Sequence, residues 1–124
     1  MLRFIFVYGT LRSEFGNPHA RGLRDSAECL GKATINGSIY LLGEYPGYRP
    51  DSDAVITGVV TGELYRLRTP DLTLAALDAY EAEEFERIPT RVSHEGIQYD
   101  AWIYQLREVP LDAPRIASGD FCAL

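Results

Sequence analysis

Runs of β-forming residues, separated by short segments rich in Gly, Pro and Asn, recur through most of the chain. Branched and aromatic side chains favour strands, whereas Gly, Pro and Asn favour the turns between them. Because the connections are short, we expect the strands to be mostly antiparallel. The Asn36-Gly37 and Glu95-Gly96 pairs each predict a hairpin, and Asn-Gly is the stronger signal. The expected strands cover residues 2–8, 29–35, 38–42, 54–67, 87–93 and 97–106.

One helix is clearly marked in the second half of the chain. Thr69 is a suitable N-cap, Pro70 fits the first turn, and Asp71 complements the positive end of the helix dipole. We expect this helix to end near Tyr80 or Glu81.

Glycine and proline mark the segments that we expect to be irregular. Gly58 and Gly62 interrupt the expected 54–67 strand and predict bulges or a close approach of another backbone. The remaining expected elements are a short helix at 19–24, an irregular loop at 43–53 and mostly coil at 110–124.

These elements together predict a single domain covering residues 1–124. Area scaling indicates that a chain of this size buries about two-thirds of its unfolded surface, enough for a core without disulfides or metal. Five or six strands with one convincing helix indicate the α+β class. We expect a small, mixed but mostly antiparallel β-barrel, twisted and partly closed, with one main helix packed against it.

Charge and composition exclude several classes of protein. The chain has 12 Lys and Arg against 18 Asp and Glu, a formal net charge of −6, and its basic residues are scattered singly. Nucleic acids and anionic membranes are bound by clustered basic residues, so neither partner is expected. No apolar run approaches the ~20 residues that span a bilayer. The N-terminus does not resemble a signal peptide, so we expect a cytoplasmic protein.

Cysteine and histidine are too few and too scattered to predict a disulfide framework or a metal site. Cys29 and Cys122 form no CxxC pair. His19 and His94 lack partners at the spacing of a helical metal motif. Cys29 with His94 is one alternative nucleophile and base, but Cys29 lies in a β-like run, where a buried, inert thiol is the expected state.

The turn formed by Tyr8, Gly9, Thr10 and Leu11 is the first candidate site. It leaves an apolar strand, and its glycine lets the backbone turn its amides toward a ligand. Successive amides of this kind form a concavity that binds anions. The alternative is a tight turn that only closes the strand.

Glu81 is the second candidate. It shares a helix face with Leu74 and Leu77 and lies at the C-terminal end of the helix, where the dipole disfavours negative charge. It is followed closely by Glu83, Glu84 and Glu86. Partial burial, the dipole and like charges all raise the pKa of a carboxyl group, which suits a general acid or base. The alternative is a helix that ends in a solvated acidic stretch.

Other residues are weaker candidates. Tyr45 and Tyr48, in one Pro- and Gly-rich segment, are expected either to pack or to line a pocket. Asp78 is expected to be solvated or capping, with the orientation of a functional group as the alternative. Arg87 and Tyr104 are candidates for shaping the pocket, without an assigned role.

In combination, these segments resemble the gamma-glutamylcyclotransferase-like family, in particular its small gamma-glutamylamine cyclotransferase-like branch. Their order and spacing over nearly the whole chain make the resemblance specific. The matching segments are 6–12 (FVYGTLR), 37–40 with 42–46 (GSIY, LGEYP), 59–65 (VVTGELY), 77–81 (LDAYE), 101–104 (AWIY) and 116–121 (IASGDF).

The resemblance implies a small α+β barrel in which Tyr8, Gly9, Thr10 and Leu11 hold a glutamyl group and Glu81 is the catalytic acid and base. It implies an enzyme that cyclises the γ-glutamyl group of a small molecule to 5-oxoproline and releases an amine or amino acid. The implied reaction requires no metal, nucleotide or redox cofactor.

Two alternatives stay open beside this interpretation. One is a non-catalytic member of the fold that binds a small ligand, and the other is a cyclotransferase dedicated to removing a γ-glutamyl protecting group in a biosynthetic pathway. Ala82 stands where the family usually has Gly, and Phe85 where many members have Tyr. These departures concern the identity of the substrate more than the type of reaction, and the sequence predicts no oligomeric state.

Overall fold

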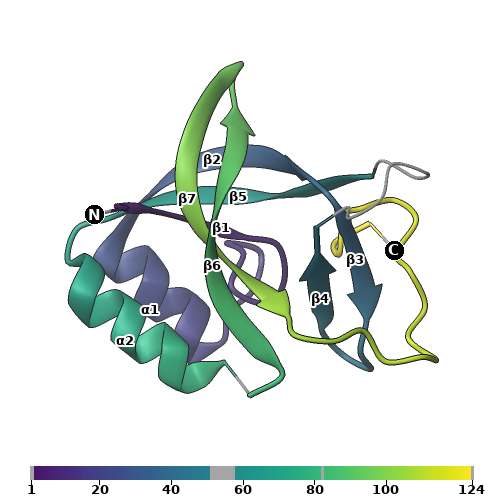
Figure 1. The fold of residues 1–124 in the computed structure, drawn as a ribbon. Helices are drawn as coiled ribbons and strands as arrows, with labels where there is room; N and C mark the ends of the chain where they lie inside the picture. Colours follow the sequence, from purple (N-terminus) through teal and green to yellow (C-terminus); the bar gives the residue numbers. More distant parts are fainter. Residues whose placement is uncertain (1, 51–57, 82, 124) are drawn as a thin grey trace.

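The computed structural model describes residues 2–50, 58–81 and 83–123 of the chain. Within these residues it contains seven strands and two helices (Figure 1). In chain order they are β1 (Phe4–Val7), α1 (Pro18–Ser26), β2 (Ala27–Asn36), β3 (Ser38–Leu41), β4 (Pro46–Arg49), β5 (Val59–Leu67), α2 (Pro70–Tyr80), β6 (Phe85–His94) and β7 (Ile97–Leu106).

Five of the described strands close into a barrel in the order β1-β5-β2-β6-β7, with β7 returning to β1. Four of the five joints are antiparallel, and the closing joint is parallel, with Ile5 opposite Trp102. The joint between β2 and β6 consists of one pair, Thr34 and Ser93. The expected small, mixed and mostly antiparallel barrel of the α+β class is confirmed.

β3 and β4 form an antiparallel hairpin that extends the sheet outside the barrel. β4 also runs parallel to β7, with Tyr48 opposite Gln105. In Figure 1 this hairpin lies beside the C-terminal segment, and Tyr40 of β3 bridges to Arg115 there. The described part of the 110–124 segment is otherwise mostly coil, as expected.

The prediction of an irregular loop at 43–53 is wrong in part, because β4 lies inside it. Its Pro and Gly residues are typical of turns, but Gly47 has another use. A Cβ atom added there would lie 2.4 Å from the Leu106 side chain, so the glycine allows β4 to lie close against β7. Residues 51–53 lie outside the described part of the chain.

The predicted hairpin at Asn36-Gly37 is also wrong. β2 pairs with β5 along its length and with β6 at Thr34, so both of its edges are occupied. β3 pairs with β4 instead. The Asn-Gly turn therefore leads the chain out of the barrel and into the outer hairpin. The predicted 87–93 and 97–106 hairpin is confirmed as β6 and β7.

The expected 54–67 strand appears as β5, and residues 54–57 lie outside the described residues. Of the two alternatives for its glycines, the structure has the close approach. A Cβ atom added at Gly62 would lie 2.3 Å from the Val7 carbonyl oxygen. The irregular register occurs in β2, between Cys29 and Gly31.

Both expected helices are present, and they lie side by side on one side of the barrel (Figure 1). α1 is longer than expected, and Asn17 caps it by accepting a hydrogen bond from the Ala20 amide. α2 begins at Pro70 and ends at Tyr80, as expected. The Thr69 side chain forms no capping hydrogen bond, and its backbone oxygen accepts from the Thr73 amide instead.

Two cores result from the alternation of side chains along the strands. One joins the helices to the outside of the barrel and includes Leu23, Leu74 and Leu77. The other fills the barrel and includes Phe6 and Leu64. β1 contributes to both cores, which explains why its sequence is a continuous apolar run rather than an alternating one.

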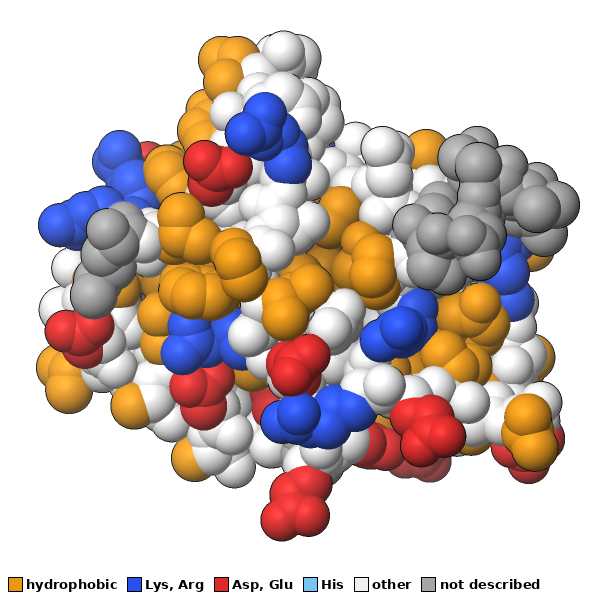
Figure 2. All heavy atoms as spheres, in the orientation of Figure 1, with side chains coloured by type: hydrophobic (Ala, Val, Ile, Leu, Met, Phe, Trp, Pro, Cys, Tyr) orange, Lys and Arg blue, Asp and Glu red, His pale blue; other side chains and the backbone are white. Residues whose placement is uncertain are grey.

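The surface carries mixed charge. On the face shown in Figure 2, Lys and Arg side chains are interspersed with Asp and Glu. Neither described helix has the length and apolar character needed to cross a membrane.

Candidate active site

A cavity of about 380 Å³ opens among the end of β1, the end of α2, the segment before β4 and the start of β6. Tyr8, Gly9, Thr10 and Leu11, hereafter the 8–11 turn, line it, and so does Glu81. The structure therefore brings together the two candidate features, which more than half of the chain separates. The other lining residues are Phe6, Val7, Glu44, Tyr45, Pro46, Tyr80, Glu84, Phe85 and Tyr104.

Tyr8 anchors the start of the turn. Its hydroxyl donates to the backbone oxygen of Tyr104 at 2.6 Å and accepts from the amide of Tyr48 at 3.0 Å. Burial raises the pKa of this phenol, so it stays protonated. One hydroxyl thus ties β1 to both β7 and β4 at the cavity.

The backbone beyond Tyr8 forms a closed turn. The Arg12 amide donates to the Gly9 oxygen at 3.0 Å, and Asn17 donates to the Thr10 oxygen at 2.8 Å. Among the described residues, the amides of Thr10 and Leu11 donate no hydrogen bond to the protein. Two consecutive amides are therefore left to bind a ligand.

Gly9 is required by a close contact. A Cβ atom added at this position would lie 2.9 Å from Cγ of Pro46 and 3.0 Å from its Cδ. The buried Pro46 belongs to β4, so the turn and the outer hairpin touch at the cavity wall. The glycine permits this contact by having no side chain.

Glu81 directly follows α2, and its amide donates to the Leu77 oxygen at 2.9 Å. Leu74 and Leu77 are buried, and Glu81 is half-buried beside them. Within the described residues its carboxylate has no hydrogen-bond or ion-pair partner. Burial raises the pKa of Glu81 to about 7, and the negative charges of Glu84 and Asp78 act in the same direction.

Asp78 is held in a network that the sequence did not reveal. Its carboxylate accepts from Arg87 at 2.9 and 3.0 Å and from the Tyr104 hydroxyl at 2.6 Å. The Arg87 guanidinium lies 4.2 Å from the ring centroid of Trp102. The hydrogen bonds from Arg87 lower the pKa of Asp78, which keeps a full negative charge near Glu81.

Aromatic side chains form much of the cavity wall. Tyr45 donates a hydrogen bond to Glu84, and its ring centroid lies 6.2 Å from that of Phe85. Tyr80 lies 3.3 Å from the Thr10 hydroxyl, joining the end of α2 to the 8–11 turn. The sequence-based alternative that Tyr45 lines a pocket is confirmed. Tyr48 is buried and is not among the residues that line the cavity.

The alternative pair of Cys29 and His94 lies outside the cavity. Cys29 is exposed in β2, so the expectation of a buried thiol is wrong. His94 is buried in β6, and its Nδ1 donates to the Lys32 oxygen at 2.8 Å. Among the described residues, no group of His, Cys, Asp and Glu is arranged to hold a metal ion.

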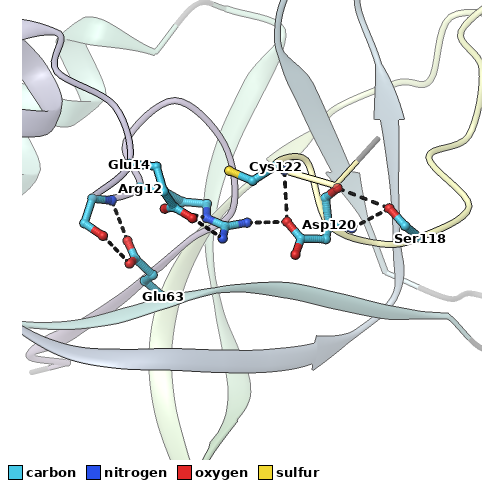
Figure 3. Close-up of polar contacts among 7 residues, drawn as sticks. Arg12, Glu14, Glu63, Ser118, Asp120 and Cys122 are labelled. Atoms are coloured by element: carbon cyan, nitrogen blue, oxygen red, sulfur yellow. Dashed lines mark hydrogen bonds and ion pairs between the residues drawn. The ribbon is translucent and has the colours of Figure 1, made fainter.

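Two sets of polar contacts, made by Arg12 and Ser13, hold the segment directly after the 8–11 turn (Figure 3). The buried Arg12 forms ion pairs of 2.7 Å with both Glu14 and Asp120. Ser13 donates from its amide and its hydroxyl to the Glu63 carboxylate on β5. The C-terminal segment and the barrel wall thus both hold the end of the turn. The contacts of Arg12 with Asp120 and of Ser13 with Glu63 join distant parts of the chain, and no local sequence pattern indicates them.

Comparisons with known proteins agree with this fold. The chain matches the family described as gamma-glutamyl cyclotransferase, AIG2-like, over residues 5–123. It is 45% identical over 120 residues to the gamma-glutamylcyclotransferase family protein ytfP of Citrobacter rodentium, covering 94% of this chain and 93% of that one. It is 37% identical over 121 residues to YtfP of Escherichia coli K12, covering 94% of each.

Solved structures of related proteins also have a similar fold. The solution structure of E. coli ytfP superposes with a TM-score of 0.67 at 34% identity, over 97% of this chain and 96% of that one. The crystal structure of YkqA from Bacillus subtilis superposes with a TM-score of 0.73 at 28% identity over 97% of this chain. This chain spans 39% of the longer YkqA. The protein therefore belongs to the gamma-glutamyl cyclotransferase, AIG2-like family.

Proposed function

We propose that the protein is a cyclotransferase that converts the γ-glutamyl group of a small molecule into 5-oxoproline and releases an amine or amino acid. The α-amine of the glutamyl group attacks its own γ-carbonyl carbon. A C–N bond forms within a five-membered ring, and the C–N bond to the leaving amine breaks. Overall, two protons pass from the attacking ammonium to the leaving nitrogen, which departs as an ammonium.

Glu81 is the proposed general acid and base. Its carboxylate takes a proton from the attacking amine and returns it to the leaving nitrogen. A group serves both steps best when its pKa lies near the working pH. Burial and the neighbouring Glu84 and Asp78 raise the pKa of Glu81 to about 7, which supports this role.

The 8–11 turn is the proposed binding element for the glutamyl group. The amides of Thr10 and Leu11 bind its carboxylate, or the oxyanion that develops at the γ-carbonyl. Holding the substrate in a folded-back conformation also brings amine and carbonyl into contact, which accelerates ring closure. The polar contacts of Arg12 with Asp120 and of Ser13 with Glu63 support this role, because they hold the turn in one conformation.

One observation carries the proposal: a half-buried carboxylate and a turn with two consecutive amides, all without a hydrogen-bond partner among the described residues, line the same cavity. Neither feature is distinctive by itself, since tight turns and acidic helix ends are common. A cavity that contains both has a proton acceptor and an anion site within reach of one small molecule.

The test is an assay for 5-oxoproline with γ-glutamyl dipeptides, ε-(γ-glutamyl)-lysine and glutathione. We expect turnover by the wild type and a loss of about 10²-fold or more in the Glu81→Gln variant, the scale of general-base catalysis. Glu83→Gln is the matched control. It also removes one carboxylate near the end of α2, but Glu83 does not line the cavity.

Normal turnover by Glu81→Gln would show that the assignment of the base is wrong. Binding of these compounds without product, measured by calorimetry on folded protein, would favour the non-catalytic alternative. Turnover of only a single complex γ-glutamyl compound would favour the dedicated biosynthetic enzyme.

A further inference from the structure

The charged side chains that line the described part of the cavity are all of one sign. Among the described residues that line it, three side chains are carboxylates, Glu44, Glu81 and Glu84, and none is Lys, Arg or His. Glu81 is half-buried, whereas Glu44 and Glu84 are exposed. The two exposed carboxylates therefore lie where the cavity meets solvent.

Glu84 is held in place at this opening. Its carboxylate accepts a hydrogen bond from Tyr45, whose ring packs against Phe85. Tyr80 adds a third aromatic side chain to the wall. Carboxylates beside aromatic faces form a favourable environment for a cation, because both attract positive charge.

Arginines close to these residues in the chain are already paired. Arg12, directly after the 8–11 turn, forms ion pairs with Glu14 and Asp120. Arg87, two residues after Phe85, forms two hydrogen bonds with Asp78 and stacks on Trp102. Arg107, whose amide donates to the Glu84 backbone oxygen, forms an ion pair with Glu86 and donates to the Glu83 oxygen. None of these three arginines lines the cavity, so a carboxylate on the leaving group would face Glu44 and Glu84 with no cation among the described lining residues.

We infer that the released amine carries a second, positively charged group and no carboxylate, as in γ-glutamyl derivatives of diamines and polyamines. This inference rests on the proposed function and adds the class of leaving group. In this arrangement the amides of Thr10 and Leu11 hold the glutamyl group, and its reacting carbonyl lies by Glu81. The far end of the leaving amine then meets Glu84 and Glu44 at the opening.

The test uses three γ-glutamyl amides of equal length that differ only in terminal charge. Their amines are 1,4-diaminobutane (cationic end), n-pentylamine (neutral end) and 5-aminopentanoate (anionic end). We expect kcat/KM for 5-oxoproline formation to fall about 3-fold at each step from cation to neutral to anion, the scale of an exposed ion pair. The differences should shrink at high ionic strength.

Variants identify the carboxylates responsible. Glu84→Gln keeps an acceptor for the Tyr45 hydroxyl but removes the charge, so the ratio of kcat/KM between the cationic and neutral amides should fall about 3-fold. Adding Glu44→Gln should lower this ratio further. Glu83→Gln removes a neighbouring charge that does not line the cavity, and the ratio should stay at the wild-type value.

The outcomes separate this inference from the proposed function. Product from all three amides at equal rates, or fastest from the anionic amide, overturns the inference and leaves the cyclotransferase activity intact. If none of the three amides gives product, the proposed function fails for this class of substrate. The binding of the three amides to the Glu81→Gln variant, measured by calorimetry, then tests the charge preference independently of turnover. Tightest binding of the cationic amide would support the inference, and equal binding of all three would overturn it.

Discussion

The guanidinium of Arg12 lies 2.7 Å from Asp120, so the residue that follows the 8–11 turn is ion-paired to a segment 108 residues farther along the chain. Arg12 is 6% exposed, and a buried guanidinium is costly without its partners. Burial acts to raise the pKa of Asp120, but hydrogen bonds from Arg12 and from the Cys122 amide outweigh it and hold this pKa below its usual value. The ion pair therefore fixes the C-terminal segment against the turn.

Asp120→Asn should lower the free energy of unfolding by about 1–2 kcal/mol at neutral pH, because Arg12 loses one of its two anions. A carboxylate with a depressed pKa contributes stability above its unfolded pKa and loses it as the pH falls through the folded pKa. The deficit should therefore vanish in acid, below the ordinary value of 3.8. Urea unfolding of the wild type and of Asp120→Asn, from neutral to acid pH, measures this difference in the free energy of unfolding. A difference that does not change with pH would contradict the ion-pair explanation.

Tyr8→Phe should destabilise the protein by about 1–3 kcal/mol, because two backbone groups lose a buried partner. Tyr65→Phe is the matched control. Among the described residues, the buried Tyr65 hydroxyl makes no hydrogen bond of normal geometry and has only the weakly polar Cys29 thiol beside it, so its removal should cost little. Chemical denaturation of both variants tests the contrast. Equal destabilisation would mean that the Tyr8 hydrogen bonds contribute nothing specific.

Glu81 should make the protein less stable as the pH rises. Its folded pKa of about 7 exceeds the ordinary 4.5, so the folded state binds more protons between these values and stability falls as the pH rises through them. The difference corresponds to about 3 kcal/mol at most. Glu81→Gln removes this penalty, so the variant should gain stability over the wild type above pH 7 and match it near pH 4. Thermal unfolding across this range provides the measurement, and a pH-independent difference would argue against the raised pKa.

Gly9→Ala should lower stability by about 1–3 kcal/mol and weaken substrate binding, because the new methyl group collides with the Pro46 ring. The same substitution at Gly22 is the control. Gly22 lies inside α1 with open space around it, and alanine there should stabilise the helix by about 0.5–1 kcal/mol. Unfolding and calorimetric binding measurements on both variants test the pair. A harmless Gly9→Ala would mean that the turn and β4 separate easily.

Elements governed by local chemistry were predictable from the sequence. α2 begins at Pro70 because that residue suits a first turn, and β6 and β7 pair across the Glu95-Gly96 turn. The sequence predicted a partly buried carboxyl group with a raised pKa at Glu81, because this residue lies at the end of α2 and shares a helix face with two leucines. The structure confirms that it is half-buried near like charges.

Features that depend on distant pairing were not predictable in the same way. The composition of 43–53 is that of a turn, and the strand there depends on the pairing of β4 with β3 and β7, which Gly47 permits by its close approach to Leu106. Asn36-Gly37 favours a hairpin locally, but β5 and β6 occupy the edges of β2. The Asp78 network depends in the same way on β6 and β7 lying beside the end of α2.

The parallel joint between β1 and β7 has a consequence for how the protein is made. β1 is translated before every other strand of the barrel, yet its two neighbours are β5 and β7. Until residues 97–106 leave the ribosome, the apolar β1 has an unpaired edge, and pairing over such a sequence separation is slow. Tyr104 of β7 lines the cavity and its backbone oxygen accepts the hydrogen bond from Tyr8, so a nascent chain completes its binding cavity only after β7 has been made.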